Sequence, residues 1–138
     1  MTIICKENAL PEEIQAIRQG VLEEATLAGM GETIPFTLLI KDENAQVVSG
    51  ATGHTMYNYL FVDWLWVHRS HRDKGWGSKL LHAAENLGNE RKCKFSCLFT
   101  MSWEALSFYQ KHGYQIEYVR EGFEKGAKMY LLRKSLNS

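Results

Sequence analysis

Residues 68–81 read HRSHRDKGWGSKLL: cationic side chains gather first, and Gly-Trp-Gly then leads into an apolar periodic stretch. The whole chain has a formal net charge of zero, so this excess of positive charge is local. Glycine lets the backbone approach a ligand closely, and the unpaired N–H groups of a helix's first turn attract an anion. Arg72 and Lys74 add charge-assisted donors. The stretch predicts a phosphate or pyrophosphate site; the alternative is an ordinary strand-to-helix connection with solvated basic residues.

Two other kinds of phosphate loop do not fit these residues. A Walker loop needs a glycine, four residues and then Gly-Lys-Ser/Thr, whereas the order here is Gly77-Ser78-Lys79 without the upstream glycine. A dinucleotide-binding fingerprint needs a third glycine or alanine at the position of Leu80. It also belongs to a strand order that starts nearer the N-terminus than this loop. Neither of these two phosphate-binding motifs therefore fits the loop.

Strand and helix patterns alternate on both sides of the loop. Residues 59–67, YLFVDWLWV, form a nearly continuous aromatic and β-branched run, which predicts a central strand buried on both faces. Leucines and alanines at helical spacing follow the loop. Strands interleaved with helices, with hairpins at both ends, predict an α/β fold with a mixed sheet. The other predicted elements are strands at residues 2–5, 36–40, 45–52, 95–99, 114–120 and 127–132, a helix from Pro11 to about Gly29, and a short helix capped by Ser102.

Length and composition limit the class of protein. At 138 residues and 15.9 kDa, the chain is predicted to form one domain, residues 1–138, that buries a core without metal or disulfide staples. Hydrophobic residues make up 45% and charged residues 23%, which is typical of a soluble globular protein. Zero net charge and a pI near 7.0 argue against a nucleic-acid or membrane-surface binder. No apolar run reaches the length of a membrane span.

Cysteine usage and the N-terminus indicate a cytoplasmic protein. The three cysteines form an odd set with no framework spacing, which favours a reducing compartment. The start of the chain, MTIICKENALPEE, lacks the basic region and long apolar region of a signal peptide. A metal site is not expected, because no paired metal-ligand spacing occurs among the nearest candidates, which are His68, His71, His82, Cys93 and Cys97.

Two motifs resemble those of a known family. RDKGWG, with Arg72, Gly75 and Gly77, resembles the Arg/Gln-x-x-Gly-x-Gly/Ala motif of the GNAT superfamily of N-acetyltransferases. ALSFYQKHGY, residues 105–114, resembles that family's second motif, Ala-x-x-Phe/Leu-Tyr-x-Lys-x-Gly-Phe/Tyr. Both occur in the family's order and spacing, and the layout of the whole chain agrees. The resemblance implies a single GNAT-like domain with a mixed, mostly antiparallel central sheet of about six to seven strands flanked by helices.

Two positions depart from the family pattern. Asp73 stands where the family often has glycine, which puts a carboxylate near the phosphates, although Arg72 and Lys74 would offset its charge. Ser102 stands where many members carry asparagine, and its hydroxyl can still cap the helix or hold a water. Neither departure removes the backbone N–H groups and basic side chains that are expected to bind phosphate.

The resemblance implies acetyl-CoA as cofactor. The pantetheine arm would pair with the strand that ends at Val67, like an added strand. Main-chain N–H groups near Trp66 and Val67 would hold the thioester carbonyl and stabilise the charge that forms on attack. The pyrophosphate would lie on the backbone N–H groups of Arg72, Asp73, Lys74, Gly75, Trp76, Gly77 and Ser78.

Two residues are candidates for acid–base catalysis. The second motif implies that Tyr109 lies by the sulfur and protonates the leaving thiolate; the alternative is a packing tyrosine beside Phe108. Asp63 is the candidate base, because a lone carboxylate in a buried strand would be costly without a role or partner. Its alternative is a structural hydrogen bond near a splay in the sheet. His68 could also relay protons, but it is more typical of a loop histidine.

Strand alternation predicts that Asp63 shares a face with Phe61, Leu65 and Val67. Four nearby aromatic residues could line an acceptor pocket that favours an aromatic or cationic substrate, although alternation prevents all of them from facing it. These are Tyr57, Tyr59, Trp64 and Trp66.

Three functions remain open from the sequence. The preferred prediction is an acetyl-CoA-dependent N-acetyltransferase that acts on a primary amine of a small molecule by direct attack on the thioester. The alternatives are a protein lysine or N-terminal acetyltransferase, and a non-catalytic CoA-binding domain. Tyr109 and the intact glycine loop favour the enzyme. No nucleic-acid or membrane partner is expected, and a homodimer is a possible assembly.

Overall fold

The computed structural model describes residues 1–136, which divide into two compact units. The first unit is Met1–Thr33, and the second begins at Ile34. That residues 1–138 form a single domain stays a prediction. In the described part of the chain, no helix has the length and the apolar character needed to cross a membrane.

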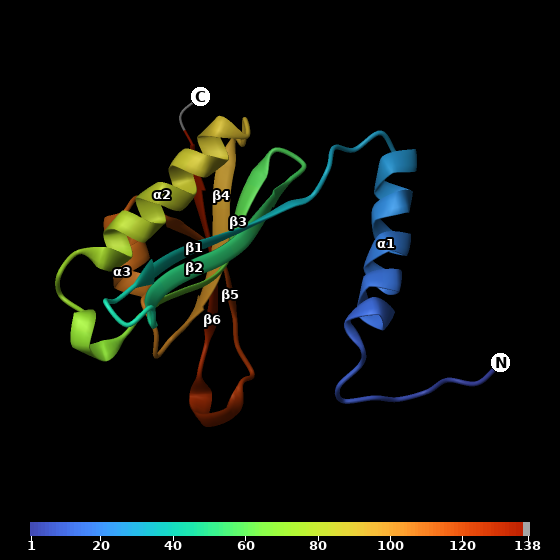
Figure 1. The fold of residues 1–138 in the computed structure, drawn as a ribbon. Helices are drawn as coiled ribbons and strands as arrows, with labels where there is room; N and C mark the ends of the chain where they lie inside the picture. Colours follow the sequence, from blue (N-terminus) through green and yellow to red (C-terminus); the bar gives the residue numbers. More distant parts are fainter. Residues whose placement is uncertain (137–138) are drawn as a thin grey trace. The chain divides into compact units, whose positions relative to one another are not determined.

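Helix α1, Pro11–Leu27, makes up most of the first unit (Figure 1). It begins at Pro11 as predicted, since proline lacks the N–H that a first turn leaves unpaired. The Glu13 carboxylate accepts hydrogen bonds from the Leu10 N–H and the Lys6 ammonium, each at 2.8 Å. The predicted strand at residues 2–5 is wrong, because the β-branched residues there pair with no strand in residues 1–136.

The second unit is built on a six-stranded sheet with the order β1-β2-β3-β4-β6-β5. All neighbouring strands are antiparallel except β3 and β4. This mixed, mostly antiparallel sheet with its helices confirms the predicted α/β fold class. The strands are β1 Ile34–Lys41, β2 Val47–Met56, β3 Tyr59–Val67, β4 Phe95–Met101, β5 Gln115–Arg120 and β6 Met129–Ser135.

Helix α2, Trp76–Glu90, lies across one face of this sheet (Figure 1). Its predicted apolar stripe is correct, because Leu81 and Ala84 are fully buried. They pack in a core with Leu60 and Val62 of β3. This packing fixes where α2 begins relative to the end of β3, and so positions the loop between them.

A β-bulge interrupts β3 at Asp63. Thr52 pairs with Trp64, whereas the next residue, Gly53, pairs with Val62, so Asp63 is an extra residue without a partner. The two-residue period of the strand therefore shifts by one. The predicted face shared by Asp63, Phe61, Leu65 and Val67 is wrong for this reason.

The bulge changes which side chains face α2. Leu65 packs against the same core as Val62, and the Val67 side chain reaches the start of α2. Phe61 lies on the opposite face, where its ring stacks on His54 with centroids 5.4 Å apart. The prediction that β3 is buried on both faces is wrong: in its first half one face is buried and the other half-buried, and in its second half Trp64 is 79% exposed.

Strands β3 and β4 separate soon after they begin. They pair over only three positions, where Tyr59–Phe61 meets Phe95–Cys97. Beyond Phe61, β3 has no strand partner on its β4 side within the described residues. This splay leaves the backbone of the second half of β3 open toward β4.

Helix α3, Leu106–Lys111, follows β4 after a short turn. The prediction that Ser102 caps it is wrong, because the helix begins only at Leu106 after Ala105. The Ser102 hydroxyl instead accepts a hydrogen bond from the Lys128 N–H at 3.0 Å. The Ser102 N–H donates to the Lys128 carbonyl at 2.8 Å. Ser102 therefore ties the end of β4 to the start of β6.

Candidate active site

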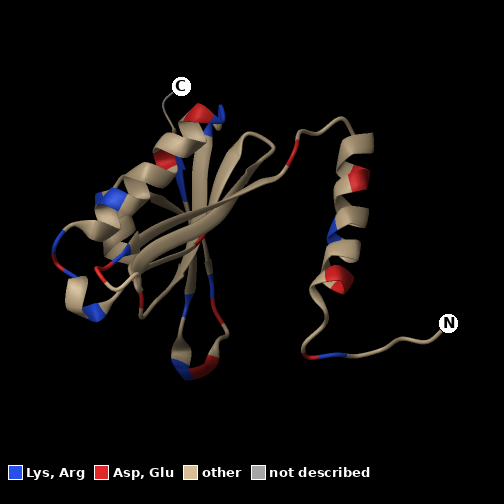
Figure 2. Ribbon diagram, viewed as in Figure 1, with Lys and Arg blue, Asp and Glu red and all other residues tan. Residues whose placement is uncertain are grey.

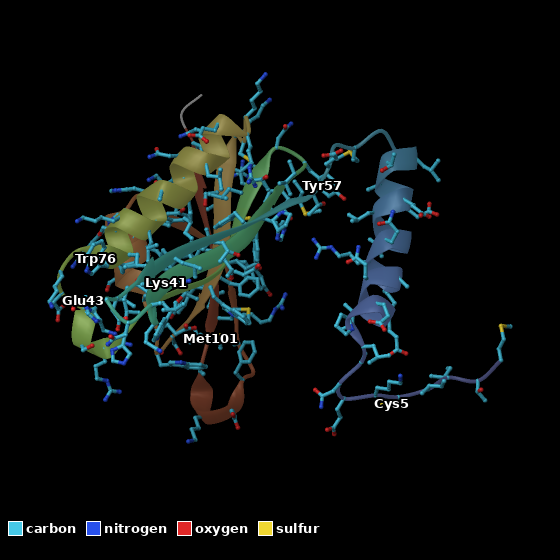
Figure 3. All side chains as sticks on the ribbon, in the orientation of Figure 1. Cys5, Lys41, Glu43, Tyr57, Trp76 and Met101 are labelled. Carbon is cyan, nitrogen blue, oxygen red and sulfur yellow. The ribbon has the colours of Figure 1, made fainter. Side chains whose placement is uncertain are left out.

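A cleft of about 510 Å³ opens where β3 ends, α2 begins and α3 follows β4. Most of the predicted cofactor-binding residues line it, whereas Lys74, Gly75 and Ser78 do not. The structure therefore brings the loop and the second motif to one place. The lining residues are Leu65, Trp66, Val67, His71, Arg72, Asp73, Trp76, Gly77, Trp103, Glu104 and Phe108. Figure 3 labels Trp76 at the start of α2.

Short-range hydrogen bonds fold the connection from β3 to α2. His68 caps the 3₁₀ turn η1, Arg69–His71, where its Nδ1 accepts from the Ser70 N–H at 3.1 Å. This contact fits the loop role that the sequence favoured for His68. The Arg72 Nε–H donates to the Val67 carbonyl at 3.0 Å and holds this arginine against the end of β3.

Two residues of the loop adopt left-handed backbone conformations. Gly75, directly before α2, has a φ of 81°, which glycine adopts without strain. Asp73 has a φ of 61°. Aspartate is among the few other residues that tolerate this region, because its short polar side chain bonds locally. The backbone therefore accounts for an aspartate at a position where the resembled motif often has glycine.

The loop carries a row of unpaired backbone N–H groups. From Asp73 to Ser78, none of them reaches an acceptor within residues 1–136, and the first bonded amide is that of Lys79, which donates to the Gly75 carbonyl at 3.1 Å. Because the helix dipole adds positive potential here, this row is suited to an anion. Figure 2 shows positive, negative and positive residues in succession along the loop, which are Arg72, Asp73 and Lys74.

The open side of β3 offers further N–H groups. The His68 N–H donates to the Val48 carbonyl of β2 at 2.8 Å. Hydrogen-bonded and non-bonded pairs alternate in an antiparallel ladder, so the Trp66 N–H points toward β2. The N–H groups of Leu65 and Val67 point toward the splay. Of the two amides predicted to hold a thioester, only that of Val67 is directed there.

Gly77 brings the start of α2 close to α3. A Cβ built at this position would lie 3.4 Å from Cζ of Phe108 and 3.8 Å from Cγ2 of Val67. A single methyl group would therefore just fit, whereas a branched side chain would press on Phe108 or fill the cleft. The glycine keeps the space in front of the amide row open.

Five lining residues were not among the site residues predicted from the sequence: Leu65, His71, Trp103, Glu104 and Phe108. Trp103 is 70% exposed, and Oε1 of Glu104 accepts a hydrogen bond from the Met101 N–H at 3.0 Å. A signal was available, because residues directly after the carboxyl end of a strand commonly border the ligand crevice in α/β sheets. Trp103 and Glu104 follow β4 in this way.

Tyr109 lies in the hydrophobic core beside the cleft and is not among the cleft's lining residues. Burial, with a smaller contribution from the Glu104 carboxylate, raises the pKa of Tyr109 to about 12, so its hydroxyl stays protonated at neutral pH. Within residues 1–136 the hydroxyl has no hydrogen-bond partner and is not sealed from solvent. Its role as proton donor stays a prediction.

Asp63 is exposed at the bulge. The reasoning that its burial would require a role or a partner is therefore wrong. An extra residue in a bulge is left out of the ladder, so this carboxylate reaches water at no desolvation cost. That Asp63 acts as a base stays a prediction.

The described residues hold no other evident reactive centre. Burial raises the pKa of the Cys97 thiol to about 11, which makes it a poor nucleophile at neutral pH. In residues 1–136, no group of three His, Cys, Asp or Glu side chains gathers as metal ligands. The cleft and its amide row are therefore the candidate site.

Comparison with known proteins decides the family. A family model described as an acetyltransferase (GNAT) domain matches residues 35–116. The chain belongs to the GNAT family of acetyltransferases. It is an acetyltransferase enzyme, and the resemblance inferred from the two motifs is confirmed. GNAT membership implies the use of acetyl-CoA.

Individual GNAT relatives cover much of the chain. Blasticidin-S acetyltransferase from Streptomyces morookaense is 34% identical over 95 residues, 68% of this chain and 70% of that protein. An acetyltransferase from Agrobacterium fabrum is 30% identical over 116 residues, 83% of this chain and 84% of that protein. The crystal structure of an acetyltransferase from Bacillus cereus superposes with a TM-score of 0.78 at 31% identity, covering 96% of this chain and 98% of that one.

Proposed function

We propose that this GNAT enzyme transfers the acetyl group of acetyl-CoA to a primary amine of a small molecule. The observation that carries the proposal is the row of unpaired N–H groups from Asp73 to Ser78 at the mouth of the cleft. A protein leaves such donors unpaired in one place at little cost only where water or an anionic ligand can accept from them.

The residues present fit the parts of acetyl-CoA in order along the cleft. The amide row, Arg72 and Lys74 suit the diphosphate, and Gly77 keeps the approach open. The Leu65 and Val67 amides face the splay, where an extended amide-containing arm can add to the sheet edge. The Asp73 carboxylate opposes the phosphates, and it lies between two cations, Arg72 and Lys74, in the chain.

Acetyl-CoA would supply an activated acetyl group as a thioester, and the protein would orient it and move protons. The Val67 N–H would donate to the thioester carbonyl. Tyr109 would donate its proton toward the departing sulfur, because its raised pKa keeps the hydroxyl protonated. The attacking amine must be neutral, so Asp63, His68 or a water would accept its proton.

A small-molecule acceptor is favoured over a protein because one relative, blasticidin-S acetyltransferase, is named for a small-molecule substrate. The exposed ring of Trp103 on the cleft supports an acceptor that is planar or cationic. Acetylation of a protein lysine or N-terminus is the second candidate. We place the enzyme in the cytoplasm, as the cysteine usage predicts.

The test is a thiol-release assay with acetyl-CoA and a panel of amines. The panel contains blasticidin S, polyamines, aminoglycosides, lysine peptides and free N-terminal peptides, and mass spectrometry identifies the acetylated product. We expect turnover with a small-molecule amine. Turnover with peptides alone supports the second candidate. If calorimetry detects binding of acetyl-CoA and no amine of the panel is acetylated, the proposed acceptor class is wrong; if it detects no binding, the whole proposal is wrong.

A further inference from the structure

His112 joins the two walls of the cleft. It lies at the C-terminal end of α3, where its Nδ1 is 2.8 Å from the Phe108 carbonyl oxygen. Its Nε2 is 2.9 Å from Oγ of Ser78, in the first turn of α2. Phe108 lines the cleft, and Ser78 ends the amide row. One imidazole therefore connects the phosphate-binding end of α2 with α3.

These two contacts fix the tautomer of His112. A carbonyl oxygen only accepts hydrogen bonds, so Nδ1 carries the proton that it donates to Phe108. In the neutral ring, Nε2 then accepts, and the Ser78 hydroxyl donates to it. The Ser78 hydroxyl is thereby turned toward His112, while its backbone N–H remains in the amide row.

The bridge matters because, within residues 1–136, it is the side-chain hydrogen bond that links the start of α2 to the end of α3. α3 spans only Leu106–Lys111, and so short a helix has little stability of its own. Helix α2 packs mainly on β3 and β2, and it meets α3 where Gly77 lies against the Phe108 ring. The His112 ring also packs on the Phe108 ring, with centroids 4.6 Å apart.

We infer that His112 is a positioning residue, which holds α3 against the first turn of α2 so that the cleft keeps the width that the cofactor needs. This inference rests on the proposed function, because it assumes that the cleft binds acetyl-CoA. Both ring nitrogens of His112 are hydrogen-bonded to protein atoms, so neither is open to exchange a proton with a ligand. Its loss raises the Kd and KM for acetyl-CoA and leaves kcat nearly unchanged.

The test compares His112→Phe with His82→Phe. The first change keeps an aromatic ring on Phe108 and removes both hydrogen bonds. The second is a matched control, since His82 is an exposed histidine of α2 whose ring lies 5.4 Å from that of His112. We expect His112→Phe to weaken acetyl-CoA binding about tenfold in calorimetry, the scale of one or two lost hydrogen bonds, with kcat within about twofold. The control should match the wild type.

Two further measurements exclude a purely structural role. In a double-mutant cycle with Ser78→Ala, the double variant should bind acetyl-CoA no more weakly than the weaker single variant, because both changes break one bridge. Losses that multiply would overturn the inference. In the neutral imidazole of the wild type, nitrogen-15 NMR at alkaline pH should place the proton on Nδ1. A proton on Nε2 would also overturn it.

The outcomes separate the two proposals. If the wild type does not bind acetyl-CoA, the proposed function and the inference both fail. If the wild type binds and His112→Phe binds equally well, only the positioning role is wrong. Where a thermal melt shows that His112→Phe does not fold, Ser78→Ala carries the test, since it removes only the bond to α2 and should still raise Kd.

Discussion

The two walls of the cleft differ in composition: one presents mainly backbone groups to a ligand, and the other is made mainly of side chains. The α2 wall, residues 72–78, offers backbone N–H groups, and the side chains of Arg72, Asp73 and Lys74 are exposed. The α3 wall is built from side chains that are buried or half-buried, of which Phe108 lines the cleft and Tyr109 and His112 pack beside it. A backbone site depends on glycine and on φ values and tolerates most other changes, whereas a side-chain site depends on the identity of each residue.

The largest expected effect is that of Gly77→Val on the α2 wall. Its methyl groups would fill the space before the amide row or press on Phe108, whose Cζ lies 3.4 Å from the Cβ position. Acetyl-CoA binding, measured by calorimetry, should weaken by more than roughly 100-fold, since overpacking costs up to about 3 kcal/mol and the ligand's space is also lost.

Gly77→Ala is the matched control, because a single methyl group fits at this distance. It should weaken binding by less than about tenfold. The loss of binding in Gly77→Val should also appear in thermal melts. Acetyl-CoA should raise the Tm of the wild type but not that of Gly77→Val. Equal affinity of wild type and Gly77→Val would show that the loop assignment is wrong.

Tyr109→Phe tests the side-chain wall. It keeps the ring and removes the hydroxyl, so kcat should fall by roughly 100-fold, the usual scale of a general acid, with acetyl-CoA affinity unchanged. Because burial raises the pKa of Tyr109 to about 12, the donor stays protonated, and the wild-type rate should show no fall from this group up to about pH 10. An unchanged kcat at saturating substrate would show that Tyr109 is not the proton donor.

Tyr114→Phe is the control for a buried tyrosine with a structural hydroxyl. The Tyr114 hydroxyl donates to Oε2 of Glu85 at 2.9 Å and lies 2.7 Å from Oγ of Ser96. Its loss removes one partner of a buried carboxylate and should cost about 1–3 kcal/mol of unfolding free energy in denaturant titrations. Activity per folded molecule should persist, in contrast to Tyr109→Phe.

Asp63→Asn should have an intermediate effect. If Asp63 accepts the proton of the amine, the rate at neutral pH should fall about tenfold and recover as pH rises and the amine loses its proton unaided. The Tm should match the wild type, because Asp63 is exposed outside the strand ladder. A wild-type pH–rate profile would assign the proton to His68 or to water instead.

The same contrast explains what the sequence could predict. The glycine loop and the order of strands and helices can be predicted, because each follows from a pattern of consecutive residues. The bulge at Asp63 cannot be predicted from consecutive residues, because FVDWLWV is also compatible with an uninterrupted strand. Only the pairing with β2 shows the extra residue. Sequence also could not show that Ser102 bonds Lys128, since the two lie far apart in the chain. His112 stood inside the second motif, but its partner Ser78 is set by tertiary packing.

The smallest expected effect is that of Asp73→Asn, and it tests how far the backbone wall is indifferent to its side chains. Asparagine keeps the shape and the tolerance for a φ of 61°, and it removes only the charge beside the amide row. Acetyl-CoA affinity should rise about two- to fivefold at low salt, the range of an exposed charge interaction, and the gain should disappear at about 1 M salt, where screening is strong. Glu90→Gln, the same charge change at the far end of α2, lies about 20 Å away at 1.5 Å per residue and should change nothing. If Asp73→Asn instead weakens binding, this carboxylate holds the loop or orients Arg72 and Lys74, and the α2 wall depends on its side chains as the α3 wall does.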